Sequence, residues 1–549
     1  MAVTVTDLRT TLYQDGLTGI TGADTVETGF FAEATSSAAV AFNIATGQIY
    51  FGTTLNTVTA GNELLYVWSA IVATQNGYKE ATPANSSHAQ YIGDGTNNFI
   101  VYQAGNDRDV FKHADGQVSF QCFLIDMDYL TTANTNGDIA FLNGSLAGLN
   151  EAAITRVGAH YTTLSKALGG GNNCYMDIIR YGTEGIRITG GTTGARGKFA
   201  EICVEDRSTA DGKAHGIIRE YTTGSYGVQG TLKFGSTAAG TSWFDDTGAA
   251  VAYENRLVAD DKFRLLVEGN ITGGNETHFI LLNSTISSAR PAVTVDMSST
   301  GINELVLTGC SFLNLRNPFT LPTDTVSGSY THTVSGCSFT NVGLVNQGSV
   351  PLVDCTFNSA TDALGAIELD TSAQSDGSSG LAFISDGTGH AIYITTPGTY
   401  SFTDFTYTGY ASTNGSTGNE VVYNNSGGAV TINVSGGGTP TIRNGASATT
   451  TVNNNVPVTI VVSDAAGNFV VGAVVGVYLT SNDTEIINDE TDANGEVTGS
   501  TGASQAFYVR VRKSTTGSTR YVPVETSGNS GTVGTTLFVT LSEDLLVEL

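Results

Sequence analysis

The sequence has few basic residues, and its second half has almost none. The 549 residues contain 24 Lys and Arg against 51 Asp and Glu, which gives a net charge of −27 at pH 7. From Asn317 to Tyr508 the only Lys or Arg is Arg443, whereas sixteen Asp and Glu lie in the same stretch. Because such a surface repels phosphate, we expect no nucleic-acid partner. The acids are interpreted first as a solvated surface and second as an acidic binding face.

Long apolar runs are also absent. No segment approaches the ~18 consecutive apolar residues of a membrane-spanning helix. The first residues, "MAVTVTDLRTTLYQDG", have neither the basic start nor the apolar core of a secretory signal. We therefore expect no membrane insertion and no signal peptide, and synthesis in the cytoplasm of the cell that makes the protein.

Cysteines are few and lack the spacing of a metal site. No CxxC pair and no His-rich stretch accompanies them, which argues against zinc. Most lie among apolar residues, which predicts buried thiols in a reducing compartment. The six are Cys122, Cys174, Cys203, Cys310, Cys337 and Cys355. No phosphate-binding loop is present, and we expect neither a cofactor nor a metal.

Glycine, in contrast, is abundant, with 67 residues against only 9 prolines. Together with many Val, Ile, Thr, Phe and Tyr, this composition predicts a mostly β chain with many tight turns. Residues 1–30 are small, polar and Gly-rich without a sustained period, and we expect an arm that becomes ordered against a partner. Residues 31–149 alternate with period two in runs such as "SFQCFLID", which predicts a β-sandwich of the jelly-roll type.

One segment has the period of a helix. In "NEAAITRVGAHYTTLSKALGGG" (150–171) apolar residues recur at spacings of three and four, at Ile154, Val157, Tyr161, Leu164 and Leu168. An Asn before this face and three Gly after it are typical of helix ends. We expect a helix over 151–168 that covers the N-terminal end of the following domain, because an open end would expose strand edges.

Residues 150–447 continue with short strands broken by Gly, Asn and Ser, and they contain a repeat. "GCSF" occurs at 309–312 and 336–339, and "DCTF" at 354–357. The intervals of 27 and 18 residues suit the coils of a parallel β-helix, in which equivalent side chains stack as interior ladders. We expect a right-handed β-helix. Its interior ladder comprises Cys310, Phe312, Cys337, Phe339, Cys355 and Phe357, and the Ser or Thr between each pair faces outward.

Residues 448–549 have longer strands, separated by turns such as "DAAGN" and "STTGST". They predict a seven-stranded sandwich of about one hundred residues. Within it, "NDETDANGE" (488–496) is similar to a calcium loop that begins at Glu490. The twelfth position is Thr501 instead of a bidentate acid, so we expect a hairpin turn there.

Several stretches carry a resemblance. "VTIVVSDAAGNFVVGAVVGVYL", "DETDANGEVTGS" and "YVRVRKSTTGSTRYVPV" look like the carboxypeptidase-regulatory-like, immunoglobulin-like modules at the ends of virion proteins. With "GGAVTINVSGGGTPTIRNG" before them, they resemble the structural proteins of tailed bacteriophages. The segment "FIVYQAGNDRDVFKHADGQVSFQCFLIDMDYL" looks like the N-terminal sandwich of those proteins, which is similar in plan to lectin-like jelly rolls. The resemblance implies a place in a virion and supplies no catalytic residue.

Carboxylates that could cleave a polysaccharide are present but not marked by a motif. Cleavage needs two carboxylates about 5–9 Å apart. The candidates are Asp177, Glu201, Glu205, Asp206, Glu220, Asp245 and Asp246, the last two beside Trp243, near Arg180, Arg187 and Arg207. Acids with interspersed Arg are also what the outside of a soluble β-helix shows. The seven His are scattered, and His332 is interpreted as a solvated strand residue.

These observations favour a structural, non-enzymatic phage virion protein that forms a surface appendage. It would be a capsid decoration, a head or collar fibre, or a tail-attached spike on the virion exterior. We expect the N-terminal part to anchor to other capsid, collar or tail proteins and the C-terminal part to project for adhesion to a host or environment. The partners would be those virion proteins, further copies of the chain, preferably in a trimer, and a cell-surface glycan. The alternative is a tailspike that binds or depolymerises a polysaccharide.

Overall fold

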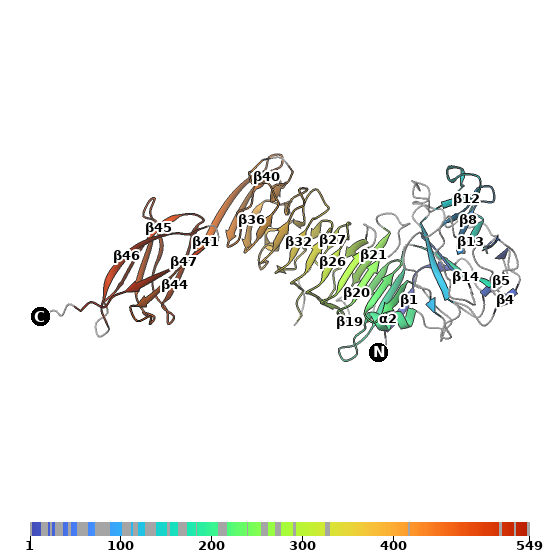
Figure 1. Cartoon of the computed structure of the whole chain (residues 1–549), viewed down its shortest axis with the longest axis horizontal. Coiled ribbons are helices and arrows are strands. Elements are labelled where there is room, and N and C mark those ends of the chain that lie inside the picture. The colour runs from blue at the N-terminus through green and yellow to red at the C-terminus, as the bar shows by residue number, and fades with distance from the viewer. Residues whose placement is uncertain are drawn as a thin grey trace. The chain divides into compact units, whose positions relative to one another are not determined.

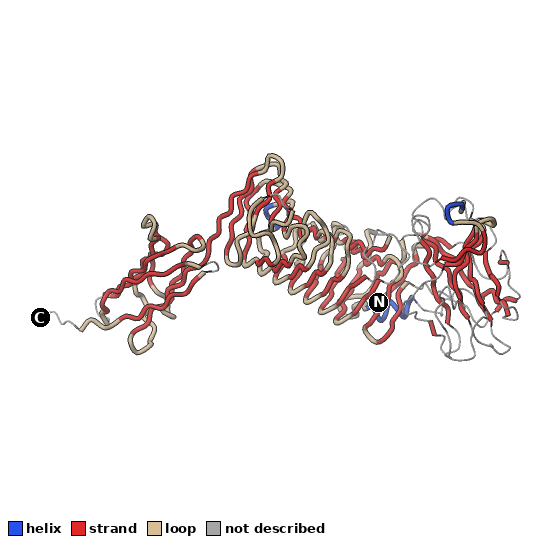
Figure 2. The backbone as a smooth tube through the Cα atoms, turned by 45° about the horizontal axis from the view of Figure 1, so that its top comes forward, coloured by secondary structure: helices blue, strands red, loops and turns tan. Residues whose placement is uncertain are grey.

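A computed structural model represents the chain, and it divides into two compact units. Unit 1 comprises residues 1–333 and 341–343, and unit 2 comprises residues 334–340 and 344–549. The structure describes residues 3–11, 20–21, 25–27, 37–41, 46–51, 64–71, 88–101, 111–112, 119–126, 139–150, 154–162, 173–182, 184–206, 217–238, 240–253, 262–269, 276–288, 293–323, 330–415, 418–514, 519–531 and 534–545. Strands dominate these residues, as the composition predicts (Figure 2).

Unit 1 begins with two antiparallel sheets. The first has the order β10-β11-β7-β14-β5-β4, with β2 beside β14, and the second has the order β12-β9-β8-β13-β6-β3. Strands β13 and β14 touch each other, and each also touches a further strand of the facing sheet. The first sheet consists of β2 (Thr10–Thr11), β4 (Thr25–Glu27), β5 (Ser37–Ala41), β7 (Leu64–Ile71), β10 (Phe111–Lys112), β11 (Ser119–Asp126) and β14 (Asn173–Tyr181). The second consists of β3 (Ile20–Thr21), β6 (Thr46–Phe51), β8 (His88–Gly93), β9 (Asn98–Val101), β12 (Ile139–Asn143) and β13 (Arg156–Thr162), and a 3-10 turn follows at Leu146–Gly148.

The helix predicted over 151–168 is wrong where the structure describes it. Residues 156–162 form strand β13, which pairs with β6 on one edge and β8 on the other. Hydrogen bonds to a strand on each side stabilise this segment as a strand, although its apolar residues have the spacing of a helix. Gly158 and Thr162 are also weak helix formers. Ile154 and Val157 are buried as predicted, whereas Leu164 and Leu168 lie outside the described residues.

The predicted sandwich and the predicted N-terminal arm also differ from the structure. Strand β14 pairs with β5 and β7, so the antiparallel part extends to Tyr181 and does not end at residue 149. The described parts of residues 1–30 form strands instead of an unpaired arm, and β1 (Val3–Asp7) pairs antiparallel with β15 (Ile186–Gly190). Strand β1 alternates buried and exposed residues, the pattern of a strand with one face in a core.

Strands β17 to β27 of unit 1 pair parallel with one another and form coils of three. Each strand from β17 to β24 pairs with the strand three later in the chain, which gives a β-helix-like arrangement. Before them, β16 (Ile218–Thr222) pairs antiparallel with β17 (Ser225–Val228). The remaining strands are β18 (Leu232–Gly235), β19 (Ser242–Thr247), β20 (Ala250–Tyr253), β21 (Phe263–Glu268), β22 (Thr277–Leu282), β23 (Thr285–Ser288), β24 (Val293–Asp296), β25 (Glu304–Thr308), β26 (Ser311–Leu313) and β27 (Phe319–Thr320).

A short helix covers the first coil. Helix α2 (Phe199–Asp206) lies next to β1 and β16 (Figure 1). Its first residue, Phe199, packs edge-on against the rings of Phe234 and Phe244 in the interior. Helix α2 lies in the stretch for which the sequence predicts short strands. The helix beside the first coil is therefore α2 and not the predicted helix over 151–168.

Unit 2 continues with coils of shorter strands. Its parallel pairs are β28 with β31, β29 with β32, β30 with β33, and then β33-β35-β38-β40, β32-β34-β37 and β36-β39-β41. The 3-10 turn Ser372–Gln374 lies among them. The strands are β28 (Thr333–Ser335), whose first residue belongs to unit 1, β29 (Ser338–Thr340), β30 (Val345–Asn346), β31 (Leu352–Val353), β32 (Thr356–Asn358), β33 (Ile367–Leu369), β34 (Ala382–Ile384), β35 (Ile392–Ile394), β36 (Gly398–Thr403), β37 (Thr406–Thr408), β38 (Val422–Asn424), β39 (Ala429–Ser435) and β40 (Ile442–Asn444).

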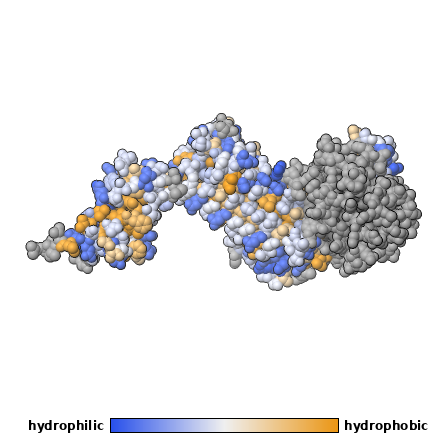
Figure 3. Space-filling view, viewed as in Figure 1, coloured by the Kyte–Doolittle hydropathy of each residue, from blue (hydrophilic) through white to orange (hydrophobic). Residues whose placement is uncertain are grey.

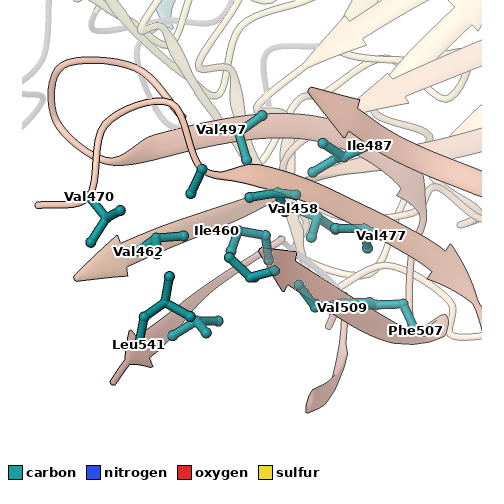
Figure 4. Packing of buried hydrophobic residues seen from close by; sticks show 14 residues of the cluster. Val458, Ile460, Val462, Val470, Val477, Ile487, Val497, Phe507, Val509 and Leu541 are labelled. Atoms are coloured by element: carbon teal, nitrogen blue, oxygen red, sulfur yellow. The ribbon is translucent and has the colours of Figure 1, made fainter. Parts of the chain in front are cut away.

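One long strand leads from the last coil into the terminal domain. Strand β41 (Thr449–Asp464) pairs parallel with β39 over residues 449–455 and antiparallel with β44 over residues 455–461. Strands β44-β41-β47 form one sheet of the terminal domain and β43-β42-β45-β46 the other, and fourteen buried residues pack between them (Figure 4). The strands are β42 (Val474–Leu479), β43 (Glu485–Glu490), β44 (Glu496–Gly502), β45 (Ala506–Lys513), β46 (Tyr521–Asn529) and β47 (Thr535–Leu541). Seven strands in two sheets agree with the sequence.

Candidate functional site

The repeated motif forms one corner of successive coils. All six predicted ladder residues are at most 2% exposed, whereas Ser311, Ser338 and Thr356 are half-buried on the other face. In unit 2, Phe339 lies opposite Phe357 with ring centroids 4.8 Å apart. In unit 1, Phe312 lies opposite Ile286. Cys203, Cys310, Cys337 and Cys355 are buried thiols, as predicted, and hydrogen bonding with Cys337 lowers the pKa of Cys355.

Among the residues that the structure describes, the same corner occurs at seven positions, of which the sequence motif identified three. Each corner has a left-handed Gly, Asn or Asp, a buried residue, a Ser, Thr or Ala, and an interior apolar residue. The corners begin at Gly248, Asn283, Gly309, Gly336, Asp354, Gly380 and Asp404. A search for the left-handed residue type instead of the cysteine would have found all seven, because the backbone turn is what recurs.

Asp and Gly alternate along this corner in unit 2. The left-handed residues at these corners are Gly336, Asp354, Gly380 and Asp404, and the left-handed Gly436 lies over Asp404 in the next coil. A Cβ added at Gly380 would lie 2.2 Å from Oδ1 of Asp354, and a Cβ added at Gly436 would lie 1.9 Å from Oδ1 of Asp404. Each Asp side chain therefore occupies the space that the Gly of the next coil leaves open.

The aromatic and acidic residues around Trp243 form a closed cluster in unit 1. Trp243 stacks on His278 with centroids 3.4 Å apart, and both are at most 5% exposed. His278 Nδ1 lies 3.0 Å from Glu304 Oε2, and Nε2 lies 3.3 Å from Glu276 Oε2. The cavity beside this stack has a volume of about 10 Å³, which is room for one water at most. A sugar cannot enter between these groups.

The remaining predicted acids serve local structure or lie apart. Asp246 Oδ2 accepts the backbone N–H of Phe199 and so begins helix α2, and burial raises the pKa of Asp246. Asp245 pairs with Arg196, Glu201 is exposed on α2, and Arg187 pairs with Glu268.

Of the remaining candidate residues, the structure describes the side chains of Glu220 and His332. Glu220 Oε1 accepts the backbone N–H of Gly224 in the turn between β16 and β17. His332 is half-buried, not solvated, and its Nδ1 accepts the backbone N–H of Leu305. The side chains of Asp177, Arg180, Glu205 and Asp206, and residue Arg207, lie outside the described residues.

The segment similar to a calcium loop is a tight turn. Asp492 Oδ1 accepts the backbone N–H groups of Asn494 and Glu496, and these bonds lower the pKa of Asp492. The turn joins β43 to β44, which lie in different sheets, so it is not the hairpin that we expected. Among the described residues, no group of three or more His, Cys, Asp or Glu could hold a metal ion.

An open groove lies on the outer face of the four-stranded sheet in the terminal domain. This groove has a volume of about 490 Å³, within the range of small-ligand sites. Its lining comes from strands β42, β43, β45 and β46: Val474, Gly476, Tyr478, Asn488, Arg510, Val511, Arg512, Pro523, Val524 and Glu525. Sequence reasoning missed it: Tyr478, Tyr508, Arg510 and Arg512 alternate with buried residues along β42 and β45, but the pairing of these two strands was not predicted.

Aromatic rings and one ion pair shape this groove. Tyr478 stacks on Tyr508 with centroids 5.4 Å apart, and the guanidinium of Arg510 lies 5.0 Å from the centre of the Tyr508 ring. Arg510 Nε donates to Glu525 Oε2 at 2.8 Å, which raises the pKa of Arg510. Gly476 leaves room for the Tyr478 ring, since a Cβ there would lie 2.8 Å from it.

Such a surface can bind a ligand, and among its described lining residues Glu525 is the one carboxylate. Tyrosine rings offer apolar faces beside hydrogen-bonding groups, and Arg510, Asn488 and Glu525 offer donors and acceptors. No family model, curated protein or solved structure matches the chain. In the part of the chain that the structure describes, no helix is long and apolar enough to cross a membrane.

Proposed function

We propose that this chain is a structural, non-enzymatic protein of a tailed-phage virion. It forms a surface appendage, such as a capsid decoration, a head or collar fibre, or a tail-attached spike. In this proposal the antiparallel sheets are a jelly-roll-like sandwich that anchors to other virion proteins. The parallel coils are a right-handed β-helix, and the terminal domain is an immunoglobulin-like module that adheres to a surface glycan.

The observation that carries the display role is strand β41. Its first half is a rung of the last coil, and its second half is the central strand of the β44-β41-β47 sheet. A continuous hydrogen-bonded strand is stiffer than a Gly- or Ser-rich linker. A strand, and not a flexible linker, thus connects the terminal domain to the last coil. Such a connection suits a domain that is displayed away from the anchoring part of the protein.

The surface of the terminal domain supports adhesion. It carries the groove beside Tyr478 and Tyr508, and it exposes large apolar side chains (Figure 3). Phe538 is 74% exposed and Phe469 is 57% exposed. Apolar side chains that gather on one surface, as they do over the terminal domain in Figure 3, commonly mark interaction surfaces. The virion location itself depends on the sequence resemblance.

Depolymerisation is the less supported alternative. The acids predicted beside Trp243 are engaged with Arg196, with the start of α2 and with neighbouring backbone. The groove of the terminal domain contains one carboxylate, Glu525, which is paired with Arg510. Polysaccharide binding without cleavage fits these arrangements better, because cleavage needs two carboxylates across one bond.

The test uses virions that encode this chain. Immunogold labelling with antibodies against residues 456–545 should decorate the outside of intact particles. Particles whose chain ends at residue 455 should still incorporate the protein but adsorb more slowly to host cells. Unlabelled particles, or particles in which the truncated chain is no longer incorporated, would contradict the proposal.

A further inference from the structure

One outer face of the terminal domain carries almost no charge. It belongs to the β44-β41-β47 sheet, and its side chains alternate along each strand with the buried residues of the core. We call the outward side chains of residues 457–463, 496–500 and 536–540, together with that of Phe469, the neutral face. Apart from Glu496 they are Pro, Thr, Ser, Val and Phe, and Figure 3 shows apolar residues gathered over β44 and β47.

Two phenylalanines and one valine form the apolar part of the neutral face. Phe538 on β47 pairs with Val461 on β41, and Phe469 forms a β-bridge with Ser463, the next outward residue of β41. Phe538 and Phe469 are exposed, whereas Val461 is buried although it does not belong to the core cluster. The two rings thus leave apolar surface in solvent around Val461, which favours their burial against a partner.

Threonines line the neutral face beside these apolar residues. Thr498 and Thr536 flank Thr459 on the neighbouring strands. The hydroxyl groups of Thr459 and Thr498 hydrogen-bond each other at 2.9 Å. Burying paired hydroxyl groups costs less free energy than burying unpaired polar groups. The neutral face therefore suits contact with another uncharged surface.

The charge of the chain favours a second copy as the partner. Two copies that each carry a net charge of −27 repel each other where acids face acids, so they approach most easily through uncharged surface. The outer face of the opposite sheet includes Arg510, Arg512 and Glu525, whereas the neutral face has Glu496 alone, on the edge strand β44. A cationic partner would instead be attracted to the acids elsewhere on the chain.

We propose that two copies of this chain associate through their neutral faces. The contact is isologous, so each copy contributes Phe469, Val461 and Phe538. The two β44-β41-β47 sheets stack face to face at the ~10 Å spacing of packed sheets. The groove lies on the other sheet of the domain and stays open. The association is therefore compatible with the proposed adhesive function and does not rest on it.

The neutral face is small, so the association is weak. Three strands about 4.8 Å apart and about seven residues long cover on the order of 300 Å², less than the ~800 Å² per partner of a standard interface. We expect a dissociation constant on the order of 100 μM to 1 mM and a monomer in dilute solution. Copies held side by side by another contact would pair more completely, because their effective concentration reaches the millimolar range.

Sedimentation velocity of the full chain tests the proposal. Samples range from about 5 μM to about 500 μM, which reaches the expected dissociation constant, in low and in high NaCl. The variants are Phe538→Glu and Phe469→Glu on the neutral face. Ser527→Glu is the matched control, because it adds the same charge opposite Tyr508 on the other sheet. Thermal unfolding of each variant establishes that the fold is kept, and Phe538→Thr decides the matter if Phe538→Glu does not fold.

The wild type should shift from monomer toward dimer as its concentration rises. The shift should be larger in high salt, which screens the repulsion between two acidic copies. Phe538→Glu and Phe469→Glu should each weaken the dimer on the order of tenfold or more, through the loss of an aromatic contact and the added repulsion. Phe538→Thr should weaken it on the order of tenfold, and Ser527→Glu should stay within about threefold of the wild type.

Three results would overturn the proposal. One is a monomer at every protein and salt concentration, which would leave the neutral face to a different partner. Another is association that weakens as the salt concentration rises, which would indicate a contact between charged groups. The third is equal weakening by Ser527→Glu and by the neutral-face variants. Adsorption to host cells is measured separately, so each of these results would leave the proposed adhesive function standing.

Discussion

The coils of unit 2 and the terminal domain build their cores in different ways. In the coils, strands such as β33, β35 and β38 are three residues long, and each interior side chain stacks on its equivalent in the next coil. In the terminal domain, strands of six to nine residues other than β41 bring fourteen buried residues together between two sheets. The coil core is therefore a series of neighbours, whereas the terminal core is one cluster.

This difference predicts how far the destabilisation caused by one core substitution extends through the fold. In a stacked repeat, stability is a sum of nearest-neighbour terms, so the loss of one side chain affects the adjacent coils most. In a sandwich, every strand contributes to one cooperative unit, so the same loss affects the whole domain. The following changes test this contrast, from the largest expected effect to the smallest.

Removing one aromatic residue from each core should have the largest effect. Phe357 is 2% exposed and lies between Phe339 and Phe383, with centroids 4.8 Å and 5.1 Å away. Phe357→Ala and Phe507→Ala should each cost about 3–5 kcal/mol. In hydrogen–deuterium exchange, the first should open mainly the coils around β29 and β34, and the second both sheets of the terminal domain. Equal opening of the terminal domain by Phe357→Ala would contradict the contrast.

A substitution at one coil corner should cost less stability, and a second substitution should restore part of the loss. Gly380 has a φ of +67°, and a Cβ there would meet Asp354 Oδ1. Gly380→Ala should cost about 1–3 kcal/mol, because a left-handed Ala is strained and the carboxylate must move. Adding Asp354→Gly should recover part of this loss in chemical denaturation. If the double variant were as unstable as the sum of the two single variants, Asp354 would not be filling the space over Gly380.

The two regions should respond to pH with opposite signs. The backbone hydrogen bond from Glu496 and that from Asn494 lower the pKa of Asp492 in the terminal domain. Its charged form therefore stabilises the fold at neutral pH, and this contribution is lost as the pH falls through the lowered pKa. Asp492→Asn should reduce the melting temperature at about pH 7, and the difference should vanish in strong acid.

Burial raises the pKa of Glu368 in the coils above 4.5. The dependence of stability on pH therefore has the opposite sign to that of Asp492. Here the neutral form is favoured in the folded state, so stability is present below pH 4.5 and is lost as the pH rises through the raised pKa. Glu368→Gln should match the wild type in acid and melt at a higher temperature at about pH 7. A variant that melts lower at pH 7 would show that the charged form of Glu368 stabilises the coil.

The exposed apolar surface of the terminal domain should matter least for stability. Phe538→Thr removes a ring that is 74% exposed, and the free energy of unfolding should change by no more than about 0.5 kcal/mol. The matched change in the core, Ile460→Val, should cost about 0.5–1.5 kcal/mol, since Ile460 is fully buried. Urea denaturation measures both. A larger loss for Phe538→Thr would place that ring in a packed environment.

Strand pairing could be predicted from the sequence where a strand or turn requires particular residue types. Period-two alternation and Gly-rich turns indicated the terminal strands, and the repeated Cys and Phe indicated parallel coils, because stacked positions need similar side chains. The helix at 151–168 was wrong because spacing alone does not count the hydrogen-bonding neighbours of a segment, and β13 has two.

The candidate groove was not predictable for a related reason. It combines residues from four strands, such as Tyr478 with Arg510. Their proximity depends on strand register, which local sequence does not specify. Helix α2 was read as a strand because its eight residues are too short to show a period, and its stability depends on Asp246 and on the packing of Phe199.

The alternation of Asp and Gly along one corner of unit 2 bears on how such a protein can change in length. A gene duplication that copied one coil would place two Asp side chains, or two Gly residues, on consecutive coils. Two Asp would compete for one space and bring like charges together, and two Gly would leave that space empty. Copying two coils at once would keep the order seen from Gly336 to Gly436. Between Gly336 and Gly436, the insertion or loss of two coils should therefore disturb this corner less than the insertion or loss of one coil.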